Sequence, residues 1–124
     1  MLGSTNAVAT LAVTDIDRAK RFYEGKLGLT SLASPEPAVL LLESGTSKLI
    51  VYASEYAGTN KATAATWTVK DVESTVNELK RKGVTFEHYD FPGVTMQGDV
   101  HIMGKSKAAW FKDPDGNILA IVSE

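Results

Sequence analysis

The sequence predicts an α+β fold of two βαβββ modules that form a curved mixed sheet with helices on its outer face. Three observations support this prediction. Apolar runs of strand length alternate with two amphipathic stretches of helical spacing. The chemistry of residues 13–16 returns at residues 69–72, which indicates an internal repeat. The last two apolar runs flank the polar turn at residues 113–117, which predicts a closing hairpin.

Module one is expected at about residues 6–55. Residues 7–13 are an apolar run between polar residues, which predicts a buried strand. Residues 14–17 resemble a helix capping box, and the amphipathic helix that follows is expected to end at Gly28. A turn is predicted at residues 34–37. The other segments of this module are predicted strands, at residues 29–33, 38–43 and 49–53.

Module two is expected at about residues 61–124 and repeats this order. A strand at residues 62–69 precedes an amphipathic helix, which Gly83 ends after a basic last turn. Residues 91–103 mix apolar side chains with glycine and are expected to be a lid over a groove, a dimer contact or extra core. Residues 93–105 are predicted to be irregular. The other segments are predicted strands, at residues 85–89, 107–112 and 118–122.

The composition is that of an ordinary globular domain, and residues 1–124 are expected to form one domain. The sequence is 44% hydrophobic and 23% charged, near the averages for globular proteins. The net charge of −2 gives no reason to expect nucleic acid or a membrane as partner. The chain has no cysteine, which excludes thiolate nucleophiles and zinc–thiolate sites. Without a membrane span or signal peptide in the sequence, a cytoplasmic location is expected.

Several motifs together resemble the vicinal oxygen chelate superfamily of glyoxalases, bleomycin-resistance proteins and extradiol dioxygenases. They are Val-Thr-Asp-Ile at residues 13–16, Phe-Tyr and Leu-Gly-Leu within 22–29, Asp-Val to Gly-Val within 71–84, and Phe-Lys-Asp-Pro-Asp-Gly-Asn at 111–117. Segments 57–65, 89–93 and 107–116 further resemble a stand-alone bacterial branch of glyoxalase-like proteins. The resemblance implies paired βαβββ modules around a small-molecule groove and, for chains of this size, a homodimer.

Metal-dependent members of this superfamily hold a divalent ion with four inward-facing His or Glu side chains. The resemblance places these positions at Val8, Ala64 and Ala120, and the fourth at Val51, where the register is least certain. Valine and alanine side chains have no lone pair to offer a metal, and Tyr52 is the only polar neighbour. The sequence therefore predicts no family metal and no other cofactor. This state resembles the bleomycin-resistance branch, in which metal-free dimers hold flat apolar drugs between aromatic side chains.

Strand parity, the positions implied by the resemblance and nearby polar or loop residues together predict which side chains line the groove. Ligand contacts are expected from Val8, Thr10, Val51, Tyr52, Ala64, Thr66, Met96, His101, Trp110 and Ala120. Trp110 is either a ligand contact or a core residue, and Trp67 is expected in the core. His101 is a candidate ligand contact or general base, and neither histidine is expected to bind a metal. Tyr52 and Tyr56 are candidates for hydroxyl groups at the mouth of the groove.

Three classes of function follow from the sequence. The first is a metal-independent protein that binds an apolar or aromatic small molecule, such as an antibiotic or toxin, without turnover. The second is a glyoxalase-like lyase or isomerase, or a dioxygenase-type enzyme, that acts on a small oxygenated substrate. The third is a structural role in which Trp110 fills the groove. The sequence assigns no catalytic residue.

Overall fold

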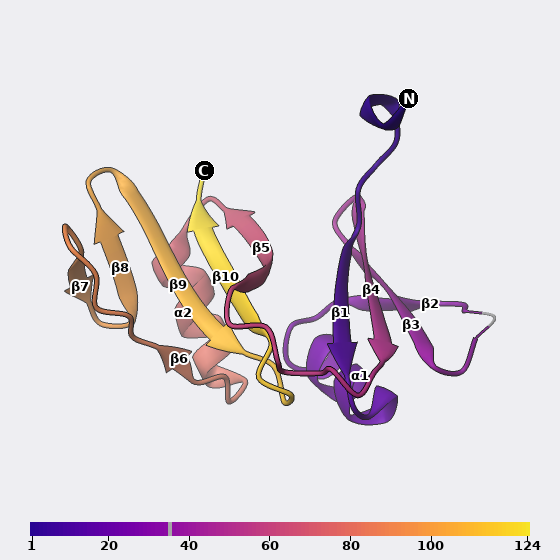
Figure 1. The fold of residues 1–124 in the computed structure, drawn as a ribbon. Coiled ribbons are helices and arrows are strands. Elements are labelled where there is room, and N and C mark those ends of the chain that lie inside the picture. Colours follow the sequence, from indigo (N-terminus) through magenta and orange to yellow (C-terminus); the bar gives the residue numbers. More distant parts are fainter. Residues whose placement is uncertain (35) are drawn as a thin grey trace.

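The computed structural model describes residues 1–34 and 36–124, and the predicted turn at 34–37 includes Pro35, which lies outside them. The described residues form the α+β fold expected from the sequence (Figure 1). After the 3-10 helix η1 (Leu2–Ser4), the first half contains β1 (Ala9–Val13), α1 (Ile16–Gly25), β2 (Thr30–Leu32), β3 (Val39–Ser44) and β4 (Ser47–Ala53). The second half contains β5 (Thr63–Val69), α2 (Val72–Arg81), β6 (Phe86–Glu87), β7 (Thr95–Gln97), β8 (Val100–Met103), β9 (Ser106–Lys112) and β10 (Ile118–Ser123).

Each half of the chain forms its own mixed sheet. The strand orders are β1-β4-β3-β2 and β5-β10-β9-β8-β7, and β6 also pairs with β9. In each half the first strand runs parallel to the last, as β1 with β4 and β5 with β10. The two sheets lie side by side, with β1 facing β5 and β10 (Figure 1). This common topology is the structural counterpart of the repeat in the sequence.

Both helices begin at an aspartate and are followed by a glycine. The Asp15 carboxylate accepts hydrogen bonds from the backbone N–H groups of Asp17 and Arg18, at 2.9 and 3.2 Å. The Asp71 carboxylate accepts one from the N–H of Ser74, at 2.9 Å. These contacts satisfy N–H groups that have no partner within the helix. After α2, Gly83 has a φ of 91°, a left-handed conformation that glycine adopts most easily.

The two halves share one hydrophobic core beneath the helices. Strand β1 contributes Leu11 and Val13, and the fully buried side chains of β9 and β10 include Phe111 and Leu119. The ring of Phe22 on α1 lies 6.4 Å from that of Phe111, so α1 packs against the second half as well as its own. Trp67 packs against this core, as predicted. Its indole N–H donates to Ser44 Oγ in the first half, at 2.9 Å.

The prediction of an irregular stretch at residues 93–105 is wrong, because most of it forms the β7–β8 hairpin. Gly98, with a φ of 62°, provides the tight turn between β7 and β8. At this turn the Asp99 carboxylate lies 2.7 Å from Lys80 Nζ on α2 and 2.7 Å from His88 Nε2 just after β6, so the hairpin is tied to both segments. Among the described residues, no helix is long and apolar enough to cross a membrane.

Candidate ligand-binding site

The side of each sheet that faces away from the helices, here called the open face, carries most of the predicted groove residues. In β1, Leu11 and Val13 are buried, whereas Thr10, which precedes Leu11, is exposed and Ala12 between the two is half-buried. On the second sheet, Thr66, Ala120 and Trp110 are successive cross-strand neighbours on β5, β10 and β9. Paired residues of neighbouring strands share a face. The structure therefore brings these three predicted residues together in one row.

An aromatic pocket of about 470 Å³ lies on the open face at one end of this row. Its lining residues are Lys61, Ala62, Thr63, Tyr89, Phe91, Trp110 and Ile118. The Trp110 indole N–H donates to Thr63 Oγ1 at 3.2 Å, which fixes the orientation of the indole ring. The rings of Tyr89 and Phe91 meet Trp110 nearly at right angles, with centroids 5.5 and 6.1 Å away. Such edge-to-face packing is favourable for aromatic pairs and holds the pocket walls in place.

His101 lies behind the aromatic pocket and is fully buried. The backbone N–H of Tyr89 donates to its Nε2 at 2.9 Å, so Nδ1 carries the proton of the neutral ring. Phe91 stacks on the imidazole at an angle of 11°, and Trp110 meets it at 88° with centroids 4.8 Å apart. Burial lowers the pKa of His101, which favours the neutral form. The histidine positions the pocket walls from within strand β8, and it is not the loop residue expected from the sequence.

Val51 is the clearest departure from the predicted site. Its side chain is fully buried in the shared core, and its neighbour on β1 is Leu11. The prediction that Val51 faces the groove is wrong by one position, because alternation along β4 places Tyr52 on the open face instead. Tyr52 is 39% exposed and pairs with Ala12.

The other predicted contacts lie at varying distance from the pocket. Val8 precedes β1 and is exposed, and Tyr56 lies exposed in the connection between the halves. Ala64 sits at an irregularity in the β5–β10 pairing and packs partly against the core. Met96 pairs with His101 at the end of the sheet and is exposed, but it does not line the aromatic pocket.

Sequence reasoning did not identify Tyr89 or Lys61 as site residues, and it included Phe91 only in the stretch expected to be a lid, a dimer contact or extra core. Tyr89 and Phe91 lie between β6 and β7, and Lys61 lies just before β5. All three belong to connections, which have no strand parity from which an orientation could be inferred. The available signal was two aromatic residues in one short connection, Tyr-Asp-Phe-Pro at residues 89–92.

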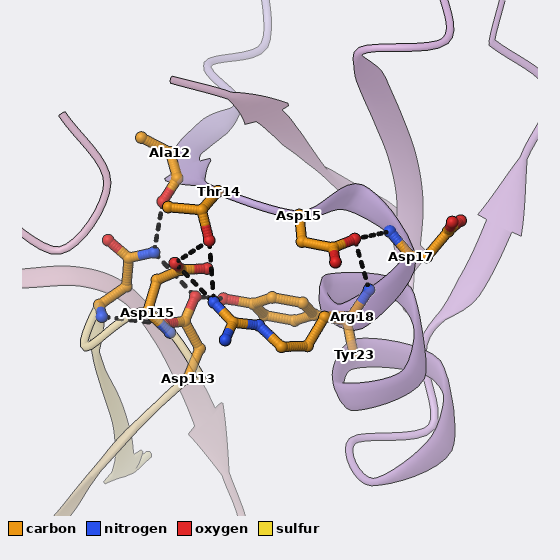
Figure 2. Close-up of polar contacts among 9 residues, drawn as sticks. Ala12, Thr14, Asp15, Asp17, Arg18, Tyr23, Asp113 and Asp115 are labelled. Carbon is orange, nitrogen blue, oxygen red and sulfur yellow. Dashed lines mark hydrogen bonds and ion pairs between the residues drawn. The ribbon is translucent and has the colours of Figure 1, made fainter. Parts of the chain in front are cut away.

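A dense polar cluster, here called the polar junction, lies where α1 meets the β9–β10 turn (Figure 2). The buried carboxylate of Asp113 accepts hydrogen bonds from Tyr23 Oη at 2.8 Å and Asn117 Nδ2 at 2.7 Å. It also accepts the backbone N–H groups of Asp115 and Asn117, each at 2.9 Å. Burial, together with the Asp113 charge, raises the pKa of Tyr23, so its hydroxyl stays protonated and donates.

The polar junction joins the two halves of the chain. Asp115 Oδ1 pairs with Arg18 Nη2 at 2.8 Å and accepts the Thr14 hydroxyl at 2.7 Å. Asn117 Nδ2 donates to the carbonyl of Ala12 on β1, at 2.8 Å. Because Asp113 is already saturated with four donors, we assign the junction to structure rather than to proton transfer.

Each half consists of a strand and a helix followed by further strands, and the two halves together define an α+β fold class with which the sequence match agrees. A family model described as the Glyoxalase/Bleomycin resistance protein/Dioxygenase superfamily matches residues 5–121. The chain belongs to this superfamily. No curated protein matches the chain in sequence.

Solved structures share the fold at low sequence identity. A glyoxalase family protein from Enterococcus faecalis aligns with a TM-score of 0.73 and 19% identity over 98% of this chain and 99% of that one. TnmS3, an antibiotic binding protein from Streptomyces sp. CB03234, aligns at 0.65 and 20% over 97% of both chains. The fosfomycin resistance protein FosX from Listeria monocytogenes aligns at 0.73 and 12% over 98% of this chain and 93% of that one.

The residues at the metal positions implied by the superfamily do not fit a metal ion. Val8, Ala64 and Ala120 carry no donor atom, and Val51 is buried in the core. Within residues 1–34 and 36–124, no group of three or more His, Cys, Asp or Glu side chains is placed to hold an ion. The donor set of this chain therefore departs from that of the metal-dependent members.

Proposed function

We propose that this protein is a metal-independent small-molecule binding protein whose ligand is apolar or aromatic, such as an antibiotic or toxin. The observation that carries the proposal is the aromatic pocket, in which Tyr89, Phe91 and Trp110 surround a space of about 470 Å³. Lys61 is the only charged side chain in its lining. A concave lining with three aromatic rings and few polar groups suits a flat ligand held by stacking. TnmS3, described as an antibiotic binding protein, has the same fold and supports this choice.

A second candidate is a glyoxalase-like lyase or isomerase, or a dioxygenase-type enzyme, for a small oxygenated substrate. One observation favours it: the hydroxyl of Tyr89 is buried and has no hydrogen-bond partner among the described residues. A buried hydroxyl without a partner is unfavourable by about 1–3 kcal/mol, and a polar group of a substrate would remove that penalty. The relationship to FosX is consistent with an enzymatic role.

We further propose that the protein acts as a homodimer in the bacterial cytoplasm, as one folded domain per copy. The open face supports a dimer because it exposes large apolar side chains that no described element covers. Val8, Tyr52, Phe91 and Met96 are each 36–39% exposed. A second copy that covered these side chains would remove apolar surface from water, which favours association. In the dimer, the first half of one copy would cover the aromatic pocket of the other.

Fluorescence titration of the variant Trp67→Phe tests the binding proposal. The chain has two tryptophans, so this variant reports Trp110 alone. Bleomycin and anilinonaphthalene sulfonate serve as probes, and mass spectrometry of the recovered probe detects any turnover. We expect saturable quenching at one site per chain and unchanged probe. Absence of quenching would overturn the binding proposal, and a chemically altered probe would favour the enzyme.

A further inference from the structure

A second cavity lies on the helix side of β9, away from the aromatic pocket. It measures about 120 Å³. Its lining residues are Leu27, Leu29, Trp67, Val69, Thr75, Leu79, Phe111 and Ile121. Phe111 lines this cavity while its neighbour Trp110 lines the aromatic pocket, so the two spaces lie on opposite faces of one strand. We call the second space the inter-half cavity, because Leu27 and Leu29 come from the first half and the other lining residues from the second.

The inter-half cavity is apolar, and its polar groups already have partners. Thr75 is the only residue in the lining without an apolar side chain, and its hydroxyl donates to the Asp71 carbonyl at 2.9 Å within α2. The Trp67 N–H donates to Ser44 Oγ. A water molecule in the cavity would lack the two to four polar partners that buried water needs. The lining itself therefore offers water few hydrogen-bond partners.

The size and the ring geometry favour a small aromatic guest. An apolar cavity of about 150 Å³ in another protein stays dry and binds benzene or xenon, and this one measures about 120 Å³. The rings of Trp67 and Phe111 lie 24° from parallel with centroids 6.5 Å apart. Leu27, Leu29 and Leu79 supply the aliphatic part of the lining.

We propose that the inter-half cavity is a second binding site, which takes a small apolar molecule of about the size of benzene. Such a guest contacts Leu27 and Leu29 of the first half and Trp67 of the second. It therefore stabilises the packing of the two halves against each other. A ligand that binds only the folded state raises the melting temperature with its concentration. This proposal is independent of the function proposed for the aromatic pocket.

Benzene is the probe for the test, used up to its aqueous solubility with the variant Trp110→Phe. In this variant Trp67 is the sole tryptophan, so its emission reports the inter-half cavity. We expect a saturable change in emission and a rise in melting temperature. In methyl NMR spectra, the resonances of Leu27 and Leu29 should shift on the same titration.

Two variants that fill the cavity, Leu29→Phe and separately Leu79→Phe, are the matched controls. Each substitution places a larger side chain in the cavity. In each variant that retains a cooperative thermal transition, we expect the apparent affinity for benzene to fall at least tenfold. If both lose that transition, the methyl shifts in the parent decide. No saturable response, an equal response in a filled and folded variant, or shifts confined to Ile118 of the aromatic pocket would each overturn the proposal. Failure here would leave bleomycin quenching of Trp110 unaffected, so the two proposals fail separately.

Discussion

The polar junction and the aromatic pocket are built from adjoining parts of the same β9–β10 hairpin but have opposite properties. At the junction, the Asp113 carboxylate is 5% exposed and accepts from four donors. At the pocket, Phe91 is 36% exposed and the buried Tyr89 hydroxyl has no partner among the described residues. The turn of the hairpin has the Asp113 carboxylate satisfied from within the chain, and the strand residues beside the turn present rings and an unsatisfied hydroxyl to a ligand.

This difference separates residues that hold the fold from residues that recognise a ligand. A saturated buried carboxylate adds stability and specifies how the halves meet, but it has no capacity left for another molecule. Exposed aromatic rings contribute little to folding and much to binding once a ligand covers them. Substitutions at the two regions should therefore change different measurements.

The largest expected effect is loss of stability in Asp113→Ala. The substitution leaves the Tyr23 hydroxyl, the Asn117 amide and two backbone N–H groups without their acceptor. We expect the free energy of unfolding to fall by about 3 kcal/mol, measured by urea denaturation. The exposed Asp90→Ala is the control and should change it by less than about 0.5 kcal/mol. Equal losses in the two variants would contradict the structural role of the junction.

The second largest effect is a loss of stability in Gly58→Ala, which tests how closely the segment between the two halves packs against the polar junction. Gly58 has a φ of 74°, and an added Cβ would overlap the backbone carbonyl of Asp115. We expect Gly58→Ala to destabilise the protein by about 2–3 kcal/mol, from overlap and backbone strain together. Gly93→Ala is a matched control, because its φ is 82° with nothing within 4 Å of the added Cβ. The difference in unfolding free energy between these variants isolates the overlap, and no difference would show that the connection moves freely.

The third effect, smaller in free energy but decisive for the proposed function, is a loss of ligand affinity at the aromatic pocket in Trp110→Ala. Trp110→Ala removes the ring that Tyr89 and Phe91 pack against. We expect at least a tenfold loss of affinity for a bound aromatic probe, which corresponds to about 1.4 kcal/mol. Isothermal titration calorimetry on Trp110→Ala and on Trp67→Phe gives the comparison, because Trp67 lies on the other face of its sheet. Unchanged affinity in Trp110→Ala would place the binding site elsewhere.

The fold and the turn at residues 113–117 were largely predictable because their signals are local. Helical spacing, aspartate caps and the Asp-Pro-Asp-Gly-Asn turn each act within a few residues. The turn prediction did not reveal that Asp113 would meet Tyr23, since that contact joins residues far apart in the chain. The hairpin at residues 95–103 was missed for a related reason. Glycines at 98 and 104 suggested a loop, whereas Gly98 forms the turn of two short strands.

The site was only partly predictable. Parity placed Thr66, Trp110 and Ala120 on one face because the β9–β10 hairpin and its turn fix the register. The resemblance gave the wrong face for Val51, since Leu49 to Tyr52 are all good strand residues and only the pairing with β1 decides their orientation. Tyr89, Phe91 and Lys61 lie in connections, whose side-chain directions depend on tertiary packing.

The smallest expected effect is a pH dependence of the free energy of unfolding that arises from His101 behind the aromatic pocket. Burial depresses the pKa of His101 in the folded state below its unfolded value. Between the folded and unfolded pKa values, His101 therefore binds more protons in the unfolded chain than in the folded one. The stability that the neutral, buried His101 contributes is fully present at pH 7. It is lost as the pH falls below about 6.5, the unfolded pKa, and through the folded pKa. We expect the free energy of unfolding to decline over this range in the natural sequence and to decline less in His101→Gln, which keeps an acceptor for the Tyr89 N–H. The Asp99 carboxylate, whose pKa is lowered by Lys80 and His88, loses its contribution only at more acidic pH. Parallel pH profiles for the two proteins above pH 5 would show that His101 is already accessible to protons, and that the pocket wall opens without a ligand.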